Sequence, residues 1–577
     1  MKKILKYMKG FGKECVLGPL FKLLEASFEL MIPLVVARIV DVGIANGDTG
    51  YVVRMCLVMV ALGVVGFISA VVAQYYSAKT AVGFAARLRS ALMAHMLGLS
   101  YTQIDTLGAS TMVTRMTSDV NQVQNGVNLT LRLLLRSPFV VFGAMVMAFT
   151  IDVESALIFA GIIPVLCVVV FGIMLITMPM YKKVQSRLDG VTSATRQNLT
   201  GVRVLRAFCK EEDEIRSFEN STHSLTRSQL SAGRISSLMN PLTFALINLA
   251  VVLLIQLGGL KVDSGELSQG MVIALYNYMS QILVELVKMA NLIITITKAV
   301  ACGNRIGDML SLDISGEKRE GETISLSGGV EFRNVYAKYA GAAGESLEDI
   351  TFTAAPGQTI GIIGGTGAGK TSLVNLIPRL YDVSRGNIFI DGQDIFALDK
   401  TALREQIGIV PQKAVLFSGT IRENLLWGNE NASDEELWQA LDTAQAREVV
   451  KDKEGELDAR VEQGGANFSG GQRQRLTIAR ALVRKPKILI LDDSASALDY
   501  ATDARLRLAI RGMKQPPTTF IVSQRAASVR YADQILVLDD GMLVGKGTHD
   551  ALLAECPVYQ EIYYSQFPKE VTRHGEK

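Results

Sequence analysis

A glycine-rich stretch carries the residue types that bind phosphate. "GGTGAGKT", residues 364–371, follows the apolar segment "TIGIIG" and precedes the helical pattern "SLVNLIPRL". Its glycines let backbone N–H groups wrap a phosphate, Lys370 neutralises phosphate charge, and Thr371 can ligate magnesium. A chance glycine-rich turn is the alternative, but both flanks are those that a P-loop requires. The predicted nucleotide-binding residues here are Gly364, Gly365, Thr366, Gly367, Ala368, Gly369, Lys370, Thr371 and Ser372.

A second strand supplies carboxylates for the same chemistry. "KILILDD" ends in Asp492 and Asp493. Asp492 is expected to hold Mg²⁺ opposite Thr371, as in P-loop NTPases. An apolar strand ending in Asp is common, so this strand alone is weak evidence. "NFSGGQRQRLTIARAL" directly before it removes the ambiguity.

The composition is that of a multidomain membrane protein. Hydrophobic residues make up 49% of the 577 residues and concentrate before about residue 305. The net charge of +3 gives no basic excess, so we expect no nucleic-acid partner. The six cysteines show no metal-ligand spacing and are interpreted as reduced packing residues. They are Cys15, Cys56, Cys167, Cys209, Cys302 and Cys556.

Six apolar runs are long enough to cross a bilayer, which takes roughly 20 helical residues. Lys and Arg crowd the N-terminus and the connections 77–132 and 179–235, so both termini are predicted to be cytoplasmic in a cell-membrane protein. The first run is too long for a signal peptide and no small-residue cleavage site follows it. The predicted crossings are 16–41, 53–76, 133–151, 154–177, 241–261 and 270–297.

Within the two long inner connections, "AARLRSALMAHMLGLS" and "RVLRAFCKEEDEIRSFENSTHSLTRSQL" mix apolar and charged residues at helical spacing and contain no Pro. We expect membrane helices that extend into the cytoplasm and turn back near 100–110 and 209–220, where each turn presents a short helix to a partner domain. The predicted transmembrane domain is 1–310 and the polar linker is 311–329. From 330 to 577, short apolar strands alternate with amphipathic helices, which is typical of an α/β domain.

The ordered motifs resemble those of an ABC-transporter nucleotide-binding domain. They are "GGTGAGKT", "PQ" at Gln412, "FSGGQ", "LILDD" and "SALD" at Asp499. With six membrane helices first, the likeness covers nearly the whole chain and resembles the exporter half-transporters, in which two such chains dimerise. The fold it implies is a six-helix transmembrane domain followed by an α/β P-loop nucleotide-binding domain, with ATP and Mg²⁺ bound and membrane lipid around it.

The resemblance also implies roles for single residues. Tyr339 matches the aromatic that stacks on adenine, and Gln412 matches the residue that contacts magnesium and senses the membrane domain. The signature motif binds the γ-phosphate of ATP held by the partner chain, which agrees with a helix N-terminus facing an anion. Asp499 would lie across the same dimer seam. The signature residues are Phe468, Ser469, Gly470, Gly471 and Gln472.

Two positions depart from the pattern of a fully active domain. Asp493 stands where that pattern has Glu, and Gln524 in "TTFIVSQR" stands where it has His. The Asp carboxylate is one methylene shorter, roughly 1.5 Å further back, and misplacement by about 1 Å can cost about a hundredfold in rate. Gln524 can donate a hydrogen bond but cannot pass a proton. Asp493, Gln524 and Gln412 are thus predicted to form a site that binds ATP well and hydrolyses it slowly, unless a backbone shift lets Asp493 work as a base.

Because the signature is intact, these departures predict a heterodimer in which this chain completes the active site of a catalytically competent partner. The combination resembles heterodimeric bacterial multidrug ABC exporters, which implies a small amphipathic substrate. "ARVEQGGANFSGGQ" departs from the usual sequence before the signature, so the contacts of that loop stay open. A lipid exporter, a peptide exporter and an ATP-gated channel or regulator are the alternatives. A peptide-processing version is disfavoured because no Cys/His peptidase segment is seen before the first helix.

Charged residues in the membrane helices admit two interpretations. Glu25 and Glu29 share one face of the first helix, as an acidic lining for cationic substrates or as partners of basic residues on a neighbouring helix. Glu285 and Lys288 are one turn apart and are expected to pair within their own helix.

Overall fold

The computed structural model describes residues 3–314 and 325–567, and the chain folds as two compact units. The first unit comprises Met1–Met96 and Ser110–Leu312, and the second comprises Leu97–Ala109 and Asp313–Lys577. Most of the predicted linker at 311–329 lies outside the described residues, which omit 315–324.

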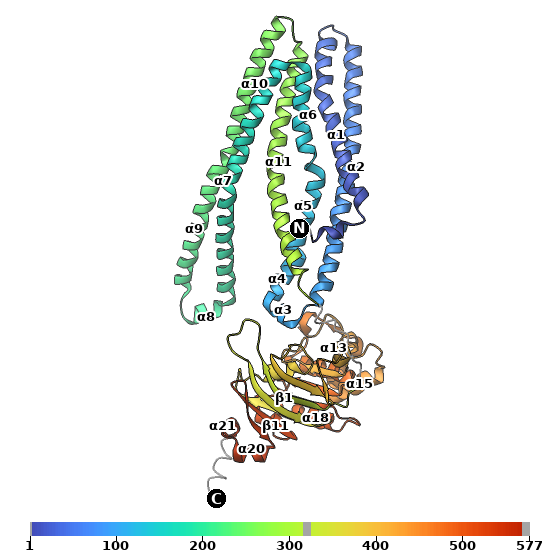
Figure 1. The fold of residues 1–577 in the computed structure, drawn as a ribbon, viewed down its shortest axis with the longest axis vertical. Coiled ribbons are helices and arrows are strands. Elements are labelled where there is room, and N and C mark those ends of the chain that lie inside the picture. The colour runs from blue at the N-terminus through green and yellow to red at the C-terminus, as the bar shows by residue number, and fades with distance from the viewer. Residues whose placement is uncertain (1–2, 315–324, 568–577) are drawn as a thin grey trace. The chain divides into compact units, whose positions relative to one another are not determined.

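Long apolar helices build the first unit (Figure 1). Helix α2 has 49 residues, α7 has 48 and α11 has 41, so each is longer than a bilayer crossing requires. Helices α1, α6 and α11 pack on one another, and so do α7 and α9. The helices are α1 (Gly12–Arg38), α2 (Thr49–Leu97), α4 (Ala109–Thr114), α5 (Val120–Leu133), α6 (Arg136–Ile151), α7 (Val153–Thr200), α8 (Val202–Ala207), α9 (Glu211–Ser237), α10 (Met239–Asp263) and α11 (Gln269–Met309), with short 3₁₀ or π turns at Leu5–Met8, Ile39–Ile44 and Arg115–Asp119.

By length and composition, five helical stretches among the described residues could cross a membrane. They are Thr49–Leu97, Ala109–Ile151, Val153–Thr200, Glu211–Asp263 and Gln269–Met309. Helix α1, which holds the predicted first crossing, is not among them because Lys22, Glu25 and Glu29 lie near its centre. Its packing against α6 and α11 nevertheless places it in the same bundle.

The second predicted turn is wrong in position. Residues 209–220 were expected to form it, but the chain reverses at α8, between α7 and α9, and Glu211–Ser237 is helical (Figure 1). Glu211, Glu212, Asp213 and Glu214 fill the first turn of α9, where acidic side chains stabilise a helix N-terminus. Cys209, with a left-handed φ of 53°, sits in the bend just before it.

Several charged residues near the centre of the bundle are paired. Lys22 contacts Glu25 within α1 at 2.5 Å. Arg136 of α6 contacts Glu29 of α1 and Glu285 of α11, both at 2.6 Å. Glu285 also accepts from Lys288 at 2.8 Å. Pairing with a neighbouring helix is therefore found for Glu29, whereas Glu285 pairs across helices as well as within its own.

Residues 97–109, which were assigned to the first domain by sequence, group with the second unit instead. Their helix α3 (Tyr101–Leu107) begins with a capping box, in which the Ser100 hydroxyl accepts from the Gln103 backbone N–H. The Gln103 side chain donates to the carbonyl of Asp313, and Asp105 accepts from Tyr381 at 2.6 Å. These polar contacts tie α3 to the second unit.

A ten-stranded sheet in the order β5-β4-β1-β2-β12-β11-β3-β10-β9-β6 forms the second unit. Strands β11, β3, β10, β9 and β6 are mutually parallel and strongly apolar, as expected for strands covered on both faces. The strands are β1 (Val330–Ala337), β2 (Leu347–Ala354), β3 (Thr359–Gly364), β4 (Arg385–Ile390), β5 (Gln393–Asp394), β6 (Ile407–Val410), β7 (Gly419–Thr420), β8 (Arg460–Val461), β9 (Ile488–Asp492), β10 (Thr518–Val522), β11 (Gln534–Asp539) and β12 (Met542–Gly547).

Two hydrophobic clusters fill the faces of this sheet. Ile363 and Leu491 belong to one cluster, and their strand neighbours Ile362 and Ile490 to the other, because successive side chains point to opposite faces. The helices are α12 (Lys370–Leu376), α13 (Lys400–Glu405), α14 (Ile421–Leu426), α15 (Asp434–Thr443), α16 (Arg447–Lys451), α17 (Gly470–Val483), α18 (Tyr500–Arg511), α19 (Ala526–Val529), α20 (His549–Glu555) and α21 (Pro557–Gln566), with 3₁₀ turns at Glu456–Asp458 and Gln463–Gly465.

Candidate functional site

Four adjacent parallel strands deliver the predicted chemistry to one edge of the sheet. The glycine-rich loop follows β3, Gln524 follows β10, Asp492 ends β9 and Gln412 follows β6. Because β3, β10, β9 and β6 are neighbours and parallel, their carboxyl ends meet at the same edge. Ligands of open α/β sheets bind at this kind of edge.

The loop after β3 has the geometry of a phosphate cradle. Gly367 and Gly369 adopt left-handed φ angles of 87° and 89°. A Cβ at Gly369 would lie 2.7 Å from the Leu347 side chain, so only glycine fits there. The Lys370 ammonium donates to the carbonyl of Gly364 at 3.0 Å, within the loop itself. Burial lowers the pKa of Lys370, and the carboxylates of Asp493 and Asp492 partly offset this.

Thr371 and Asp492 fit a magnesium ion. The Thr371 hydroxyl donates to Oδ1 of Asp492 at 3.0 Å, so two oxygen donors of the type that Mg²⁺ prefers lie side by side. No group of three or more His, Cys, Asp or Glu side chains suited to a metal is found within residues 3–314 and 325–567. Most of the coordination would therefore come from phosphate oxygens and water, which is how Mg²⁺ is usually held with nucleotides.

Magnesium-dependent nucleotide binding should weaken on acidification. Burial raises the pKa of Asp492 above its ordinary value, and only the carboxylate form ligates a metal. As pH falls, Asp492 takes up its proton earlier than an ordinary Asp, so the enhancement of ATP affinity by Mg²⁺ should shrink before the range near pH 4 where a free Asp titrates. Titrations of a fluorescent ATP analogue between pH 7.5 and 5 in nanodiscs measure this enhancement.

Asp492→Asn is the control for that titration. It removes the titrating carboxylate, so any pH dependence that remains comes from protonation of the nucleotide. Mg²⁺ should enhance ATP affinity more in wild type than in Asp492→Asn, and this difference should become smaller as pH falls. With the titration extended to pH 4, an Mg²⁺ enhancement in wild type that shrinks only where an ordinary Asp titrates would contradict the raised pKa of Asp492.

Asp493 lies beside the magnesium position in an unusual backbone conformation. Its φ is 46°, a left-handed value that Asp tolerates better than most residues, and its N–H donates to the Val522 carbonyl at 3.0 Å. Its carboxylate accepts a long 3.4 Å hydrogen bond from the Gln412 amide. Burial raises the pKa of Asp493, and the Gln412 contact partly lowers it.

The turn that carries Gln524 is held from two sides. The Gln566 side chain, at the end of α21, donates to the Gln524 carbonyl at 2.8 Å and accepts from the Ala526 N–H at 2.9 Å. Arg525 donates to the carbonyls of Ser496 and Leu498, and so links this turn to the loop before Asp499. No pattern in the sequence pointed to Gln566, because it lies 42 residues further along the chain than Gln524.

Tyr339 is supported by a second tyrosine. Tyr381 meets its ring edge to face, with centroids 5.0 Å apart, and the Tyr339 hydroxyl lies 2.9 Å from the Ser372 hydroxyl. Tyr381 also donates to Asp105 of α3. Burial and the Asp105 contact both raise the pKa of Tyr381, so its phenol stays protonated as a donor. A residue of the expected adenine platform is thus linked to α3 inside the second unit.

These groups share one cavity of about 380 Å³. It is lined by every predicted loop residue from Thr366 to Ser372, and by Tyr339, Gln412, Asp492, Asp493 and Gln524. Sequence reasoning missed five lining residues, which come from the end of β10 and from loops without a phosphate-binding pattern. They are Glu345, Ser346, Val522, Asp540 and Gly541.

The signature residues lie elsewhere and do not line this cavity. Ser469 caps α17 and forms a capping box with Gln472, so the helix N-terminus is well ordered. Phe468 was predicted among the nucleotide contacts, but only 4% of it is exposed, and it anchors this N-terminus in the core. Asp499 is exposed and caps α18, and the Thr502 N–H and hydroxyl lower its pKa.

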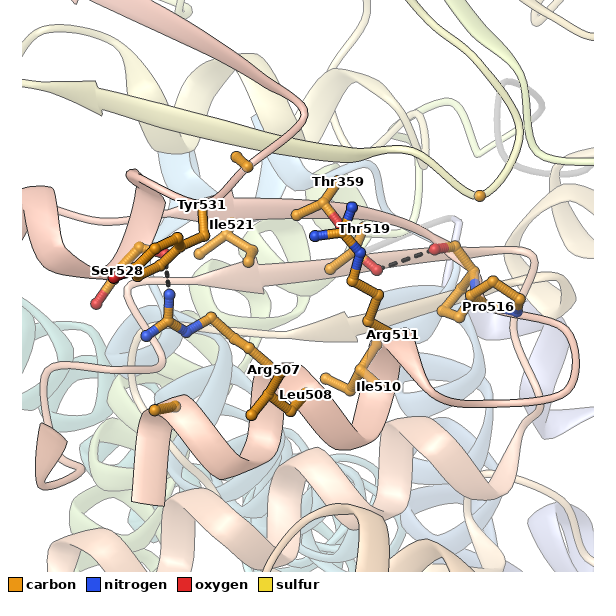
Figure 2. A pocket seen from close by; sticks show the side chains of 14 residues that line it. Thr359, Arg507, Leu508, Ile510, Arg511, Pro516, Thr519, Ile521, Ser528 and Tyr531 are labelled. Atoms are coloured by element: carbon orange, nitrogen blue, oxygen red, sulfur yellow. Dashed lines mark hydrogen bonds between the residues drawn. The ribbon is translucent and has the colours of Figure 1, made fainter. Parts of the chain in front are cut away.

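A different cavity of about 280 Å³ lies between α18 and the far ends of β3 and β10 (Figure 2). Its two guanidinium groups are already engaged. Arg507 donates to the Ser528 carbonyl at 3.0 Å, and Arg511 pairs with Asp533 at 2.7 Å. With mainly apolar walls it lacks the glycine-rich loop and carboxylates of the first cavity, so the nucleotide chemistry belongs to the first.

Comparisons with known proteins match both units. Residues 15–286 match the family described as "ABC transporter transmembrane region", and residues 347–496 match the family described as "ABC transporter". The chain is 37% identical over 572 residues to the "Uncharacterized ABC transporter ATP-binding protein YfiB" of Bacillus subtilis, with 99% of each chain covered. It is 32% identical over 485 residues to the "Probable multidrug resistance ABC transporter ATP-binding/permease protein YheI" of the same organism, with 83% of this chain and 82% of the other covered.

Among solved structures, the chain is similar to a bacterial Atm1-family ABC exporter with ATP bound. The TM-score is 0.80 at 23% identity, over 96% of this chain and 99% of the other. At 23% identity, this similarity shows a shared fold and nothing about the substrate.

Proposed function

The chain belongs to the ABC transporter family, with a membrane region and an ATP-binding domain in one polypeptide, and we propose that it is one half of a heterodimeric exporter of small amphipathic molecules. In this proposal its own ATP site is slow, and its signature completes the fast site of a partner. The observation that carries the proposal is the contrast between the altered residues Asp493 and Gln524 and the intact, well-capped "SGGQ" at the start of α17.

The chain's own site keeps everything needed to bind ATP. The loop at 364–371 wraps the phosphates, Lys370 turns from the loop carbonyls to the β- and γ-phosphates, and Tyr339 stacks on adenine. Thr371, Asp492 and Gln412 would hold Mg²⁺, which when bound neutralises charge on the phosphates. Hydrolysis is slow because Asp493 is too short to place an attacking water, and its weak contact to Gln412 does not extend its reach.

The signature acts on the partner's nucleotide. The N-terminus of α17 presents free backbone N–H groups and the positive end of the helix dipole, which suits a γ-phosphate. Gly470 has no heavy atom within 4 Å of the position a Cβ would take, so a phosphate has room to approach. Asp499, exposed at the start of α18, contacts the same seam between the two ATP-binding domains.

Closure of the two domains around ATP is passed to the membrane region through α3 and α8. Tyr381 links the adenine platform of this chain to α3. The turn at α8 exposes Val204 and Phe208, at 60% and 73%, and we assign this apolar surface to the partner's ATP-binding domain. Both termini and the ATP-binding domain are cytoplasmic in this proposal, supported by the Lys and Arg of the inner connections.

Replacing Tyr381 by Phe should uncouple transport from hydrolysis without harming ATP binding. The phenylalanine ring still packs on Tyr339, so ATP affinity should stay within twofold, whereas the hydrogen bond to Asp105 is lost. We expect transport per ATP hydrolysed to fall about two- to fivefold, which corresponds to roughly 0.5 to 1 kcal/mol, the net contribution of a typical exposed hydrogen bond. Tyr531→Phe, at an exposed tyrosine, is the matched control. Unchanged transport per ATP in Tyr381→Phe would remove α3 from the coupling path.

The substrate class rests on the family and on one relative whose name refers to multidrug resistance. A lipid exporter, a peptide exporter and an ATP-gated channel are the competing functions. A vesicle assay with the assembled pair separates pump from channel: uptake of an amphipathic dye against its gradient should require hydrolysable ATP. Downhill flux with a non-hydrolysable analogue would contradict the pump.

A further inference from the structure

Helix α11 carries a polar face where a lipid-facing helix would be apolar. Asn277, Gln281, Lys288, Asn291 and Thr295 follow one another at helical spacing, and all are at least partly exposed. Helix α2 presents the opposite pattern, with exposed Val, Leu and Phe side chains. These include Val53, Leu57, Val60, Val64, Phe67 and Val71. The exposed face of α2 suits lipid, whereas that of α11 requires a polar environment within the membrane.

A cavity of about 370 Å³ lies against this polar face, between α1, α6 and α11. One part of its wall is apolar and comes from all three helices. The other part is polar, with Glu29 from α1 and Gln281 and Lys288 from α11. Oε1 of Gln281 is buried without a hydrogen-bond partner among the described residues. The apolar residues are Ile32, Pro33, Val36, Val140 and Val284.

The formal charges of Glu29, Glu285, Arg136 and Lys288 around the cavity sum to zero, but the four side chains differ in exposure. Glu285 is 3% exposed, and it accepts from Arg136 at 2.6 Å, Ser137 at 2.9 Å and Lys288 at 2.8 Å. Glu29 accepts from Arg136 at 2.6 Å. The Glu29 side chain is nevertheless 39% exposed and that of Lys288 is 46% exposed. One carboxylate and one ammonium therefore face the cavity, with their buried partners already neutralised.

We propose that this cavity binds a zwitterionic amphipathic molecule, with its cationic group at Glu29, its anionic group at Lys288 and its apolar body on the wall formed by α1, α6 and Val284. The proposal rests on the proposed function, because it names the substrate class of that exporter. A simple cation at Glu29 would also meet the Arg136 guanidinium, and a simple anion at Lys288 would also meet Glu285. Among charged ligands, one that carries both a cation and an anion adds no net charge to this neutral cluster.

Three probes with the same twelve-carbon tail test the proposal: dodecylphosphocholine, dodecyltrimethylammonium and dodecyl sulfate. Each is titrated below its micelle concentration onto the full-length chain in nanodiscs of anionic lipid, with empty nanodiscs subtracted. We expect the zwitterion to bind at least tenfold more tightly than either singly charged probe. Equal binding, or a preference for the cation or the anion, would overturn the proposal.

Single charge removals sharpen the test. Glu29→Gln should weaken zwitterion binding about tenfold and shift the preference toward the anion, whereas Lys288→Gln should shift it toward the cation. Both variants keep Arg136 paired with Glu285, so the bundle should still fold. Lys22→Gln, which breaks a pair within α1 away from the cavity, is the matched control and should change nothing. If the three probes keep the same order of affinity in both Glu29→Gln and Lys288→Gln, the assignment of the cationic group to Glu29 and the anionic group to Lys288 is refuted.

The ligand could be a zwitterionic membrane lipid or a free molecule, and nanodiscs of phosphatidylcholine distinguish them. If the phosphatidylcholine of the nanodisc competes with the dodecylphosphocholine probe, the ligand is a membrane lipid. If probe binding is undiminished in these nanodiscs, the ligand is a free amphiphile. Because binding is measured without ATP and without transport, it does not depend on the pump. Loss of transport with intact probe selectivity would therefore count against the proposed function alone.

Discussion

Gly470→Asp in this chain should reduce the ATP turnover of the assembled transporter by about a hundredfold. A Cβ at Gly470 meets nothing within 4 Å, so the side chain fits, and an Asp in the first turn of α17 is favourable for the helix itself. The carboxylate would, however, face the γ-phosphate on the partner's site. A like charge about 5 Å from the phosphate costs roughly 3 kcal/mol at an effective dielectric constant of about 20, which corresponds to about a hundredfold in rate.

Phosphate release by the heterodimer in nanodiscs measures this effect. Gly470→Asn is the matched control, because it has the size of Asp without the charge and should retain most of the turnover. Lys370→Ala in this chain should also retain most of the turnover, because that lysine serves the site that we propose to be slow. A Gly470→Asp heterodimer that hydrolyses ATP at the wild-type rate would show that this signature does not act on the partner's nucleotide.

The double substitution Asp493→Glu with Gln524→His should raise hydrolysis at this chain's own site by about a hundredfold. The longer carboxylate reaches the attacking water, and the imidazole can donate to the γ-phosphate and carry a proton, which together supply the effect of a general base. Asp493→Glu alone should gain less than tenfold, because Gln524 still cannot pass a proton. Position 493 has a left-handed φ of 46°, so Glu there also costs about 1 kcal/mol of stability.

The site is isolated by pairing this chain with a partner whose catalytic Glu is replaced by Gln. Adding Lys370→Ala to the double variant should abolish the gain, and thermal unfolding checks that the variant remains folded. If the double variant hydrolyses ATP no faster than wild type, the slow site has another cause than these two residues.

The position of the nucleotide site followed from sequence because local signals agreed. The glycine-rich loop, its strand and its helix are contiguous, and "KILILDD" reads as a buried strand. Parallel pairing of β3, β10 and β9 then forces Thr371, Asp492 and Gln524 to one edge, so local patterns determined a non-local site.

Other features depend on contacts that no local pattern encodes. The bend at α8 lies earlier than the predicted turn at 209–220, because the acidic run at 211–214 stabilises the start of α9. The partners Arg136 for Glu29, Tyr381 for Tyr339 and Gln566 for Gln524 come from distant segments. Phe468 belongs to a motif that is predicted to bind nucleotide, but its side chain is in the core.

Rapid hydrolysis by this chain should require a partner, and ATP turnover of the purified full-length chain alone in nanodiscs tests this requirement. We expect turnover at least tenfold below that of the same chain assembled with a half-transporter that carries Glu and His at the two altered positions. Robust turnover by the chain alone, abolished by Asp493→Asn, would show that no partner is needed, because Asp493 would then be a competent base.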